Sequence, residues 1–434
     1  MESKSDIWAL YGLNSNPFIT DPILLKGGLL KMDWFVGREK EQKELFKRLD
    51  SRTGSRTLVI GDIGVGKTSF VNYVRYNAID NPKSRKQYFT HIKEISVEDD
   101  WTYMQFMVDT IYSLYSSIRN SEDGKSMISD ALYKKLESIG EINIVSSMGF
   151  GVNILGSGID YNSGRSNPQV LSYGVLSDLI NDVADEVYKN TKREIVLHYN
   201  NLDNVQRSNP ETIEKLFKNL RDLFQITHIH FVFVANMAVA NIIEGLPKVS
   251  SIFSEPILIN EMTYEEVQQI IDIRLQNLRL NDVEYIKPFD NGTLKLLFDL
   301  YKGNIRFILN SLETAVEAVT QNKPVVLGES DCSRILSNII ETKYLKDITK
   351  PRAREVLYKI AEKEEITNRG LAFALNMPRS QISIYTGDLK DKGCIYEKRR
   401  DGKDKFWSAK SDFKWLLLNK NFPNDLNQKL LKGY

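Results

Sequence analysis

The sequence predicts an α/β core, followed by a helical segment and a small C-terminal domain made of helices and a β-hairpin. Three observations predict this order. Residues 57–60 form an apolar strand that leads through a glycine-rich loop into an amphipathic helix at 69–76, two further apolar strands follow at 195–199 and 230–235, and residues 352–408 contain three short helices and two strand signals. We place the core at 1–259, with an insertion at about 120–170, the helical segment at 260–345 and the last domain at 346–434.

The composition is that of a globular protein with two or three domains. Of 434 residues, 42% are hydrophobic and 26% are charged. No apolar run reaches the ~18 residues of a membrane span, and the first residues lack the apolar stretch of a signal peptide. We therefore expect a cytoplasmic or nucleoid-associated protein without a membrane partner. The two cysteines, Cys332 and Cys394, make neither a disulfide framework nor a zinc site, and each is expected to be a small buried hydrophobic residue.

Charge is distributed unevenly along the chain. Residues 351–434 contain 18 Lys and Arg against 11 Asp and Glu, whereas residues 1–350 contain 40 against 46. Opposite net charges in two parts of one chain indicate that the C-terminal part meets a polyanion. The alternative is an uneven but solvated surface.

Residues 61–68 read Gly-Asp-Ile-Gly-Val-Gly-Lys-Thr, a complete phosphate-binding loop of the form G-x-x-x-x-G-K-[ST] between a strand and a helix. Its glycines let backbone N–H groups point at phosphate oxygens beside a helix N-terminus. Lys67 is expected to reach the β- and γ-phosphates, and Thr68 to place its hydroxyl on Mg²⁺. The sequence thus predicts a P-loop NTPase core with ATP and Mg²⁺ as cofactors. The predicted loop contacts are Gly61, Asp62, Ile63, Gly64, Val65, Gly66, Lys67, Thr68 and Ser69.

An Asn-Pro-Phe turn ending at Phe18 precedes a Phe-Val-Gly-Arg-Glu-Lys-Glu segment at residues 35–41. The pair resembles the N-terminus of AAA+ ATPases of the origin-recognition, or replication-initiator, type. In that family the segment packs against adenine, so the resemblance implies base contacts from Phe18, Val36 and Gly37. A hydrophobic staple at a helix start explains Phe35 and Val36 equally well.

The strand at 195–199 ends in Asn200, Asn201 and Asp203, where related ATPases carry acidic residues. The resemblance implies that Asn200 takes the place of the aspartate that holds the magnesium water shell, and Asn201 the place of the acid that activates water. Asparagine is uncharged and accepts no proton near neutral pH. We therefore expect weak or absent hydrolysis, unless Asp203 substitutes in part. The alternative is that the asparagines only cap a strand end.

Two later residues match the sensors of AAA+ proteins. Asn236 follows the apolar strand at 230–235, where a sensor asparagine lies near the γ-phosphate, and Arg306 ends a Gly-Asn-Ile-Arg segment that resembles the lid sensor arginine. Between them, Thr263 and Glu266 have the spacing of a capping box that begins the helical lid. The resemblance implies catalytic roles for Lys67, Asn200, Asn201, Asp203, Asn236 and Arg306.

The arginine finger of such ATPases is missing from its usual place. Residues 246–253 offer only Lys248 there, and lysine lacks the planar fork of arginine. A homo-oligomeric ring or filament is implied by the family, but the missing finger argues against one.

The insertion contains a glycine-rich stretch at 140–166 that alternates in places between apolar and polar residues. We predict a protruding β-hairpin or small extra sheet there. It either contacts a protein partner, a neighbouring subunit or nucleic acid, or it is an excursion without a partner.

Residues 352–408 predict helices at 352–364, 367–374 and 379–392, then two strands joined by a turn at Asp401-Gly402. This resembles a winged helix-turn-helix domain, whose third helix enters the major groove while the wing contacts the DNA backbone. Residues 413–434 are expected to form a closing helix. The alternative is a winged helix used for protein docking. The predicted DNA contacts are Arg379, Ser380, Gln381, Ser383, Lys398, Arg399, Arg400, Lys403 and Lys405.

Together these features predict an ATP-binding, AAA+-like switch protein with a helical lid, weak or absent hydrolysis and a winged helix that binds duplex DNA. One alternative is an active, DNA-stimulated ATPase in replication, transposition or anti-phage defence. Another is an ATP-gated scaffold for protein interactions.

Overall fold

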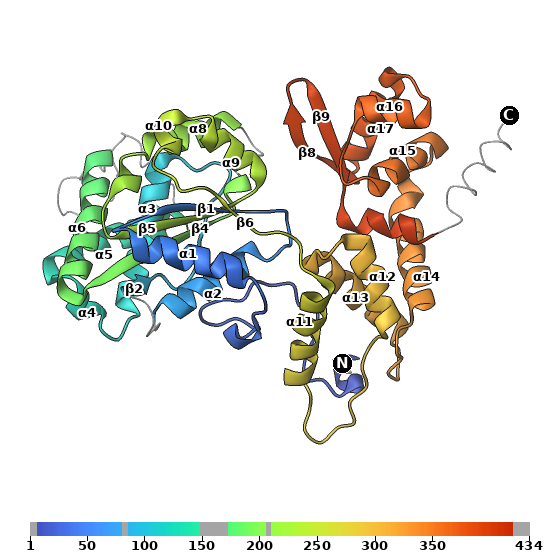
Figure 1. Ribbon diagram of the computed structural model, residues 1–434, viewed down its shortest axis with the longest axis horizontal. Coiled ribbons are helices and arrows are strands. Elements are labelled where there is room, and N and C mark those ends of the chain that lie inside the picture. The colour runs from blue at the N-terminus through green and yellow to red at the C-terminus, as the bar shows by residue number, and fades with distance from the viewer. Residues whose placement is uncertain (1–6, 80–85, 148–171, 205–209, 420–434) are drawn as a thin grey trace. The chain divides into compact units, whose positions relative to one another are not determined.

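The computed structural model describes residues 7–79, 86–147, 172–204 and 210–419, and its chain divides into two compact units (Figure 1). The core unit is residues 21–260. The C-terminal unit combines residues 1–20 with residues 261–434. Residues 1–20, which the sequence analysis assigned to the core, thus cluster with the C-terminal unit.

A six-stranded sheet forms the centre of the core unit, and its strand pairs are all parallel. Parallel strands that are covered on both faces form continuous apolar runs, and every residue of the central strand β5 is buried. The three strands expected at 57–60, 195–199 and 230–235 are confirmed as β1, β4 and β5, which lie side by side. The strand order is β2 (Gln87–Thr90), β4 (Arg193–Asn200), β5 (Ile229–Ala235), β1 (Arg56–Ile60) and β6 (Ile257–Leu258), and β3 (Ile95–Ser96) pairs with β4.

Helices cover both faces of this sheet. On one face, α1 (Glu39–Ser51) and α2 (Lys67–Ile79) pack against Val59, Val196 and Val234. On the other face, a larger core surrounds Phe231 and Phe233. Because side chains alternate along a strand, each strand supplies both cores. The helices of the second face are α3 (Tyr103–Arg119), α6 (Tyr173–Thr191), α8 (Pro210–Asn219) and α9 (Met237–Glu244), with the short α4 (Gly124–Met127) and α10 (Pro247–Ser250) nearby.

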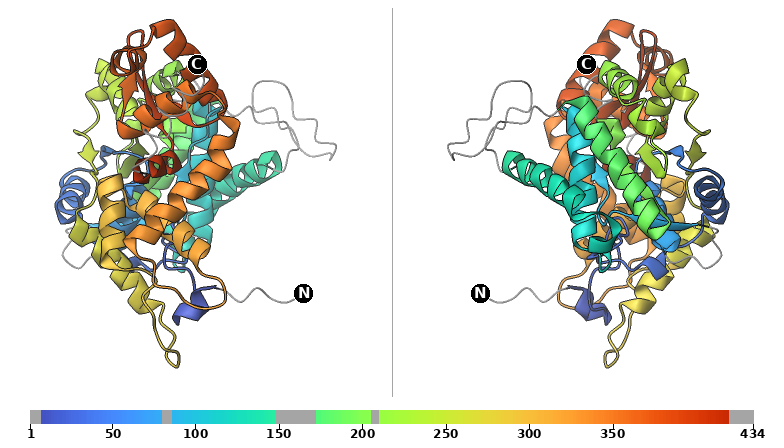
Figure 2. Two further views of the ribbon diagram at one scale, coloured as in Figure 1. Left: turned by 90° about the vertical axis from the view of Figure 1, so that its right-hand side faces the viewer. Right: turned by 90° about the vertical axis from the view of Figure 1, so that its left-hand side faces the viewer.

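The β-structure expected within residues 140–166 is wrong for its first part. Residues up to 147 belong to helix α5 (Asp130–Ser147), and the remainder of that stretch lies outside the described residues. Helix α5 packs along α3 and α6, as the side-by-side helices of Figure 2 show. Leu132, Leu136 and Ile139 recur at helical spacing and are buried in this contact. The helical periodicity upstream therefore extends through the locally alternating residues.

The C-terminal unit begins with residues 7–20. Trp8, Tyr11 and Phe18 are buried there, and the Phe18 ring lies 5.9 Å from that of Phe289. The capping box of Thr263 and Glu266 is confirmed at the start of α11. The first helices are η1 (Ile7–Tyr11), α11 (Tyr264–Asn277), α12 (Asn291–Tyr301), α13 (Ile305–Val319) and α14 (Glu329–Ile339).

The end of the described chain contains the three helices and the hairpin that the sequence predicts. The helices are α15 (Pro351–Glu362), α16 (Asn368–Leu375) and α17 (Arg379–Asp391), and the antiparallel strands are β7 (Ile366–Thr367), β8 (Ile395–Asp401) and β9 (Asp404–Ala409), in the order β7-β9-β8. The described part of the closing helix expected at 413–434 is a 3₁₀ helix at Ser411–Leu418 that buries Phe413, Trp415 and Leu416. Residues 420–434 lie outside the described residues.

Both cysteines are buried, as expected for small apolar residues, and burial raises the pKa of the Cys332 thiol to about 12. Among the helices of the described residues, none is long and apolar enough to cross a membrane.

Candidate functional site

The loop at residues 61–66 connects β1 to α2, and helix α2 begins at Lys67. Gly64 and Gly66 have φ of 88° and 92°, a left-handed backbone that favours glycine. A Cβ at Gly61 would lie 2.3 Å from the carbonyl oxygen of Ile259, so this glycine allows a close approach of two backbones. The loop therefore has the backbone turns and the helix N-terminus that phosphate binding requires.

Lys67 folds over this loop. Its Nζ donates to the carbonyl oxygens of Gly61 at 2.9 Å and Asp62 at 2.8 Å. The ammonium group is thus held at the loop, where phosphate oxygens can replace carbonyl oxygens as its partners.

Thr68 and Asn200 meet across α2 and β4. The Thr68 hydroxyl donates to Asn200 Oδ1 at 3.1 Å. Two oxygens thus lie next to each other where the loop motif places Mg²⁺, and oxygen ligands suit that ion. The pair fits a nucleotide-bound magnesium, although Asn200 contributes no negative charge.

Asn201 and Asp203 follow the strand but take different surroundings. Asn201 is left-handed, with φ of 62°, and its Nδ2 donates to Ser96 Oγ at 2.9 Å. This contact turns the Asn201 amide toward β3. Asp203 is half-buried in the short helical segment at 202–204 that follows β4. The catalytic roles expected for these two residues stay predictions.

Asn236 leaves the sheet beside the phosphate loop. Ala235 pairs with Ile60 in parallel register, so Asn236 and Gly61 leave neighbouring strands at the same edge of the sheet. The Asn236 Oδ1 accepts the backbone N–H of Val239 at 3.0 Å and caps α9. The amide thus has a structural task at the position expected for the sensor.

The residues that were expected to contact the adenine base belong to different units. Val36 is buried in the core unit and Gly37 is left-handed, with φ of 77°. Phe18 belongs to the C-terminal unit, has no exposed surface and packs against Trp8 and Phe289. Its position is thus that of a core residue. Phe35 stacks on Tyr73 of α2, with ring centroids 4.2 Å apart.

The expected lid sensor, Arg306, is exposed in the first turn of α13. The backbone just before this helix passes close to Met262. Gly303 there has φ of 88°, and an added Cβ would lie 2.0 Å from Met262 O. At the segment expected to carry the finger, Lys248 lies in α10, and Arg221 Nε donates to the Lys248 carbonyl at 3.0 Å. Sequence reasoning missed this arginine because it is 27 residues away in the chain.

A buried polar layer lies under the phosphate loop, and sequence reasoning missed it. Arg75 is fully buried, and its guanidinium donates to Thr90 Oγ1 at 2.8 Å and to Asn72 Oδ1 at 2.9 Å. The same Asn72 oxygen lies 3.1 Å from His198 Nδ1. Burial lowers the pKa of Arg75 to about 9, so it stays charged at neutral pH. Thr68, Asn72 and Arg75 recur at helical spacing, so this polar face of α2 continues from the loop into the core.

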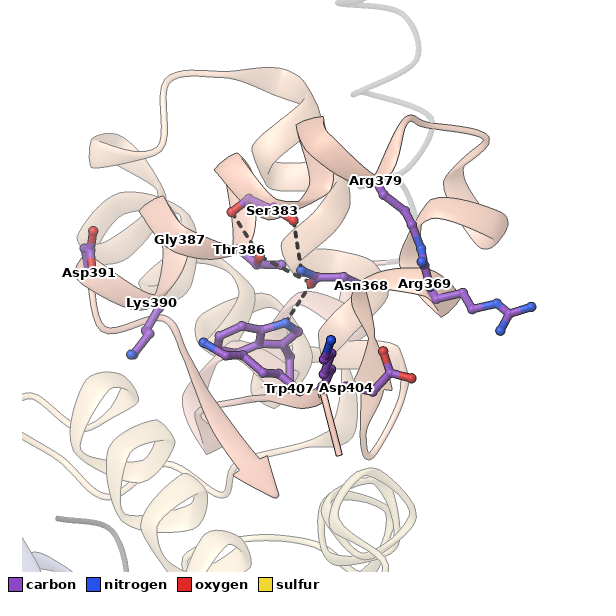
Figure 3. Close-up of a pocket in the computed structure, with 12 residues that line it drawn as sticks. Asn368, Arg369, Arg379, Ser383, Thr386, Gly387, Lys390, Asp391, Asp404 and Trp407 are labelled. Carbon is purple, nitrogen blue, oxygen red and sulfur yellow. Dashed lines mark hydrogen bonds between the residues drawn. The ribbon is translucent and has the colours of Figure 1, made fainter. Parts of the chain in front are cut away.

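A groove of about 540 Å³ lies in the C-terminal unit between α16, α17 and β9 (Figure 3). One face of α17 lines it from Arg379 through Ser383 to Lys390. Asn368 links the three elements that line the groove. Its Oδ1 accepts the Trp407 indole N–H at 2.7 Å, and its Nδ2 donates to Ser383 Oγ at 3.2 Å. The charged residues that line the groove are Arg369, Arg379, Lys390, Lys403 and Lys405, with Asp391 and Asp404.

The nine residues expected to contact DNA differ in their surroundings. Arg379, Ser383, Lys403 and Lys405 line the groove. Ser380 and Gln381 are exposed on α17 but do not line it.

The wing arginines have acidic partners. Arg399 Nε donates to Glu365 Oε1 at 2.9 Å, and the guanidinium lies 3.5 Å from the Phe406 ring centroid. Arg400 Nε lies 2.8 Å from Glu397 Oε1, and Lys405 Nζ lies 3.7 Å from Glu397 Oε2. Intramolecular ion pairs thus offset part of the wing's charge. Lys398 is the remaining predicted wing contact, and it lies outside the groove lining.

The sequence of residues 38–248 matches the KAP family P-loop domain. No curated protein matches the chain. Among solved structures, the chain is similar to the ORC2 protein of Aeropyrum pernix in its ADPNP–ADP complexes, at 16% identity and a TM-score of 0.46, covering 97% of this chain and 100% of that one. It is also similar to the Walker-type ATPase paby2304 of Pyrococcus abyssi, at 13% identity and a TM-score of 0.48, covering 92% and 99%.

A third similar structure is the Aeropyrum pernix ORC1 protein in complex with DNA, at 15% identity and a TM-score of 0.43, covering 98% of this chain and 100% of that one. The prediction of an α/β core with a P-loop NTPase fold is confirmed by the family match and by the parallel sheet with its phosphate loop. The core unit therefore has the P-loop NTPase fold, and residues 38–248 match the KAP family P-loop domain.

Proposed function

We propose that this protein is a nucleotide-controlled switch that binds ATP with Mg²⁺, hydrolyses it slowly and binds duplex DNA through its C-terminal unit. The observation that carries the proposal is the Thr68–Asn200 hydrogen bond of 3.1 Å, which puts a neutral amide beside the loop threonine. A complete phosphate loop favours binding, whereas an amide in place of a carboxylate lowers the charge available to hold the metal and activate water.

In the nucleotide site, Lys67 and the loop N–H groups bind phosphate oxygens, and Thr68 with Asn200 supplies oxygens toward Mg²⁺. The ion would offset phosphate charge when bound. Asn201 donates to Ser96 and has no basic lone pair, so it takes no proton from an attacking water. Bound ATP therefore persists, which suits a switch better than a fast motor.

For the DNA site, we propose that the C-terminal helices and hairpin act as a winged helix. Five cations and two carboxylates line the groove beside α17. Phosphate contacts of this kind position a protein on DNA, while base edges are read by the exposed α17 residues. Ser380 and Gln381 are exposed on α17 outside the groove lining and are available for such base contacts.

The test is to measure ATP binding and ATP turnover on one preparation, with and without duplex DNA, beside Lys67→Ala. Tight binding with negligible turnover, and a DNA affinity that changes between apo and ATP-bound protein, is the expected result. Turnover that rises on adding DNA and disappears in Asp203→Ala would instead identify an active ATPase.

A second candidate function, a scaffold that docks proteins, is favoured by one observation. Phe373 on α16 is 91% exposed and Ile384 on α17 is 64% exposed, and large exposed apolar side chains often mark interaction sites. Phe373→Ser would then abolish capture of a co-purifying protein without changing DNA affinity. If Phe373→Ser lost DNA affinity as well as protein capture, the result would count against docking.

A further inference from the structure

We propose that Arg38 is a positioning residue that couples the phosphate loop to Asn260, the last residue of the core unit. The inference rests on the proposed nucleotide switch and names the contact through which occupancy of the loop is transmitted. The Arg38 side chain is buried, and one guanidinium nitrogen, Nη2, donates to Val65 O at 3.3 Å and to Asn260 O at 2.6 Å. A single charged group thus bridges the loop and the end of the core unit.

The backbone at Arg38 is arranged to aim this side chain inward. Gly37 and Arg38 are both left-handed, with φ of 77° and 67°. A non-glycine residue in this region is strained and persists where the surroundings hold it there. Helix α1 starts directly after Arg38, and the Arg38 side chain makes no cap for it. The Arg38 carbonyl accepts the Gln42 N–H at 2.8 Å at the helix start, while the side chain makes the two contacts to Val65 and Asn260.

The contact to Val65 affects an N–H group of the loop that is available to bind phosphate. The carbonyl of Val65 and the N–H of Gly66 belong to one peptide group, so a guanidinium on the oxygen polarises and orients the N–H. Gly66 lies in the loop motif immediately before Lys67, where N–H groups face phosphate. Arg38 thus strengthens a phosphate donor without touching the phosphate through its own side chain.

The contact to Asn260 extends the effect to the boundary of the unit. The neighbouring Ile259 donates its N–H to Ile60 O at 2.8 Å, and its carbonyl lies where a Cβ on Gly61 would be 2.3 Å away. One end of the loop therefore contacts Ile259 directly, and the other reaches Asn260 through the Arg38 guanidinium. A change of the loop on phosphate binding cannot leave this segment unaffected, because Arg38 shares its guanidinium between them.

Hydrogen exchange of the full chain, followed by mass spectrometry, tests this coupling. In the wild type, Mg²⁺ with a non-hydrolysable ATP analogue is expected to slow exchange both in peptides covering 61–68 and in peptides covering 257–262. In Arg38→Gln at saturating analogue, the slowing at 61–68 is expected to remain while that at 257–262 is lost. Lys40→Gln, which removes an exposed charge from the same helix, is expected to behave as the wild type.

Arg38→Lys separates coupling from loop building. A lysine ammonium group contacts one of the two carbonyls more readily than both. The slowing of exchange at 257–262 in Arg38→Lys is therefore expected to lie between those of the wild type and Arg38→Gln. An unchanged response at 257–262 in Arg38→Gln would overturn the proposal. So would loss at both segments in both variants at saturating analogue, since Arg38 would then only build the loop. If the wild type shows no slowing at 61–68, the nucleotide function itself fails, and the coupling fails with it.

Discussion

Arg399 and Glu365 form an ion pair across 34 residues of sequence, with Arg399 Nε 2.9 and 3.0 Å from the two carboxylate oxygens. A paired guanidinium has to lose its carboxylate before it can neutralise a phosphate. The sequence predicted Arg399 as a DNA contact from its charge and from its place in the wing of a segment that resembles a winged helix. The structure instead brings Arg369 and Lys390, which the sequence analysis did not select, into the groove beside α17.

Groove and wing cations are therefore expected to contribute unequally to DNA binding. Lys390→Gln and Arg369→Gln should each reduce the slope of log affinity against log salt by about 1, because each removes a phosphate contact. Arg399→Gln is the matched control and should reduce it less. Binding to one duplex is measured by fluorescence anisotropy over a series of salt concentrations. An Arg399→Gln slope change as large as that of Lys390→Gln would contradict the assignment.

Asn200→Asp is expected to lower the Mg²⁺ concentration needed for half-maximal ATP binding, roughly fivefold to tenfold. The reason is that a carboxylate replaces a neutral amide beside Thr68, and contacts to charged groups are stronger. A magnesium titration of ATP binding measures the midpoint. Asn201→Asp makes the same chemical change one residue along, where the side chain faces Ser96, and should leave the midpoint unchanged. Equal shifts in the two variants would mean that the contact to Thr68 does not define the metal position.

Gly303→Ala is expected to destabilise the C-terminal unit by about 1–3 kcal/mol or more. Its φ of 88° disfavours any side chain, and the new Cβ would lie 2.0 Å from Met262 O. Gly387→Ala is the control in the same unit, because its Cβ meets no heavy atom within 4 Å and glycine inside a helix is less stable than alanine. In chemical unfolding, the midpoint of Gly303→Ala should fall below that of the wild type, and the midpoint of Gly387→Ala should rise above it. A Gly303→Ala protein as stable as the wild type would contradict the close backbone approach.

Acid is expected to destabilise the core unit below about pH 6.5. Burial and the neighbouring Arg75 hold the pKa of His91 and of His198 well below 6.5, so the folded protein keeps both rings neutral. The unfolded chain binds their protons once the pH falls below about 6.5, and stability is then lost by up to about 1.4 kcal/mol per histidine for each further pH unit. Unfolding midpoints between pH 7.5 and 5.5 measure this slope. His198→Gln should reduce it, and an unchanged slope in that variant would contradict the cause.

The parts of this protein that follow from local sequence were predicted well. The phosphate loop depends on consecutive residues, and the strands β1, β4 and β5 are apolar runs whose burial follows from their composition. The capping box of Thr263 and Glu266 also needs only four neighbouring positions. Each of these features is determined within one short segment, so no knowledge of the fold was required.

Features that depend on distant partners were not predicted. Arg75 appeared as an ordinary helical residue, because Thr90 and His198 reach it only when β2 and β4 form the sheet. In the same way Glu365 neutralises Arg399 only in the folded hairpin. The alternating residues of 141–147 predicted β-structure, but their backbone continues helix α5, whose earlier residues are buried against the core.

The grouping of residues 1–20 with residues 261–434 makes the core unit an insertion within the C-terminal unit. Two chain crossings therefore join the units, one at residues 20–21 and one at 260–261. A fragment that begins at Glu261 would lack Trp8 and Phe18 and would leave Phe289 without its aromatic neighbour. A fragment of residues 21–260 keeps its sheet and both of its cores, so the unit in the middle of the chain is the natural one to produce alone.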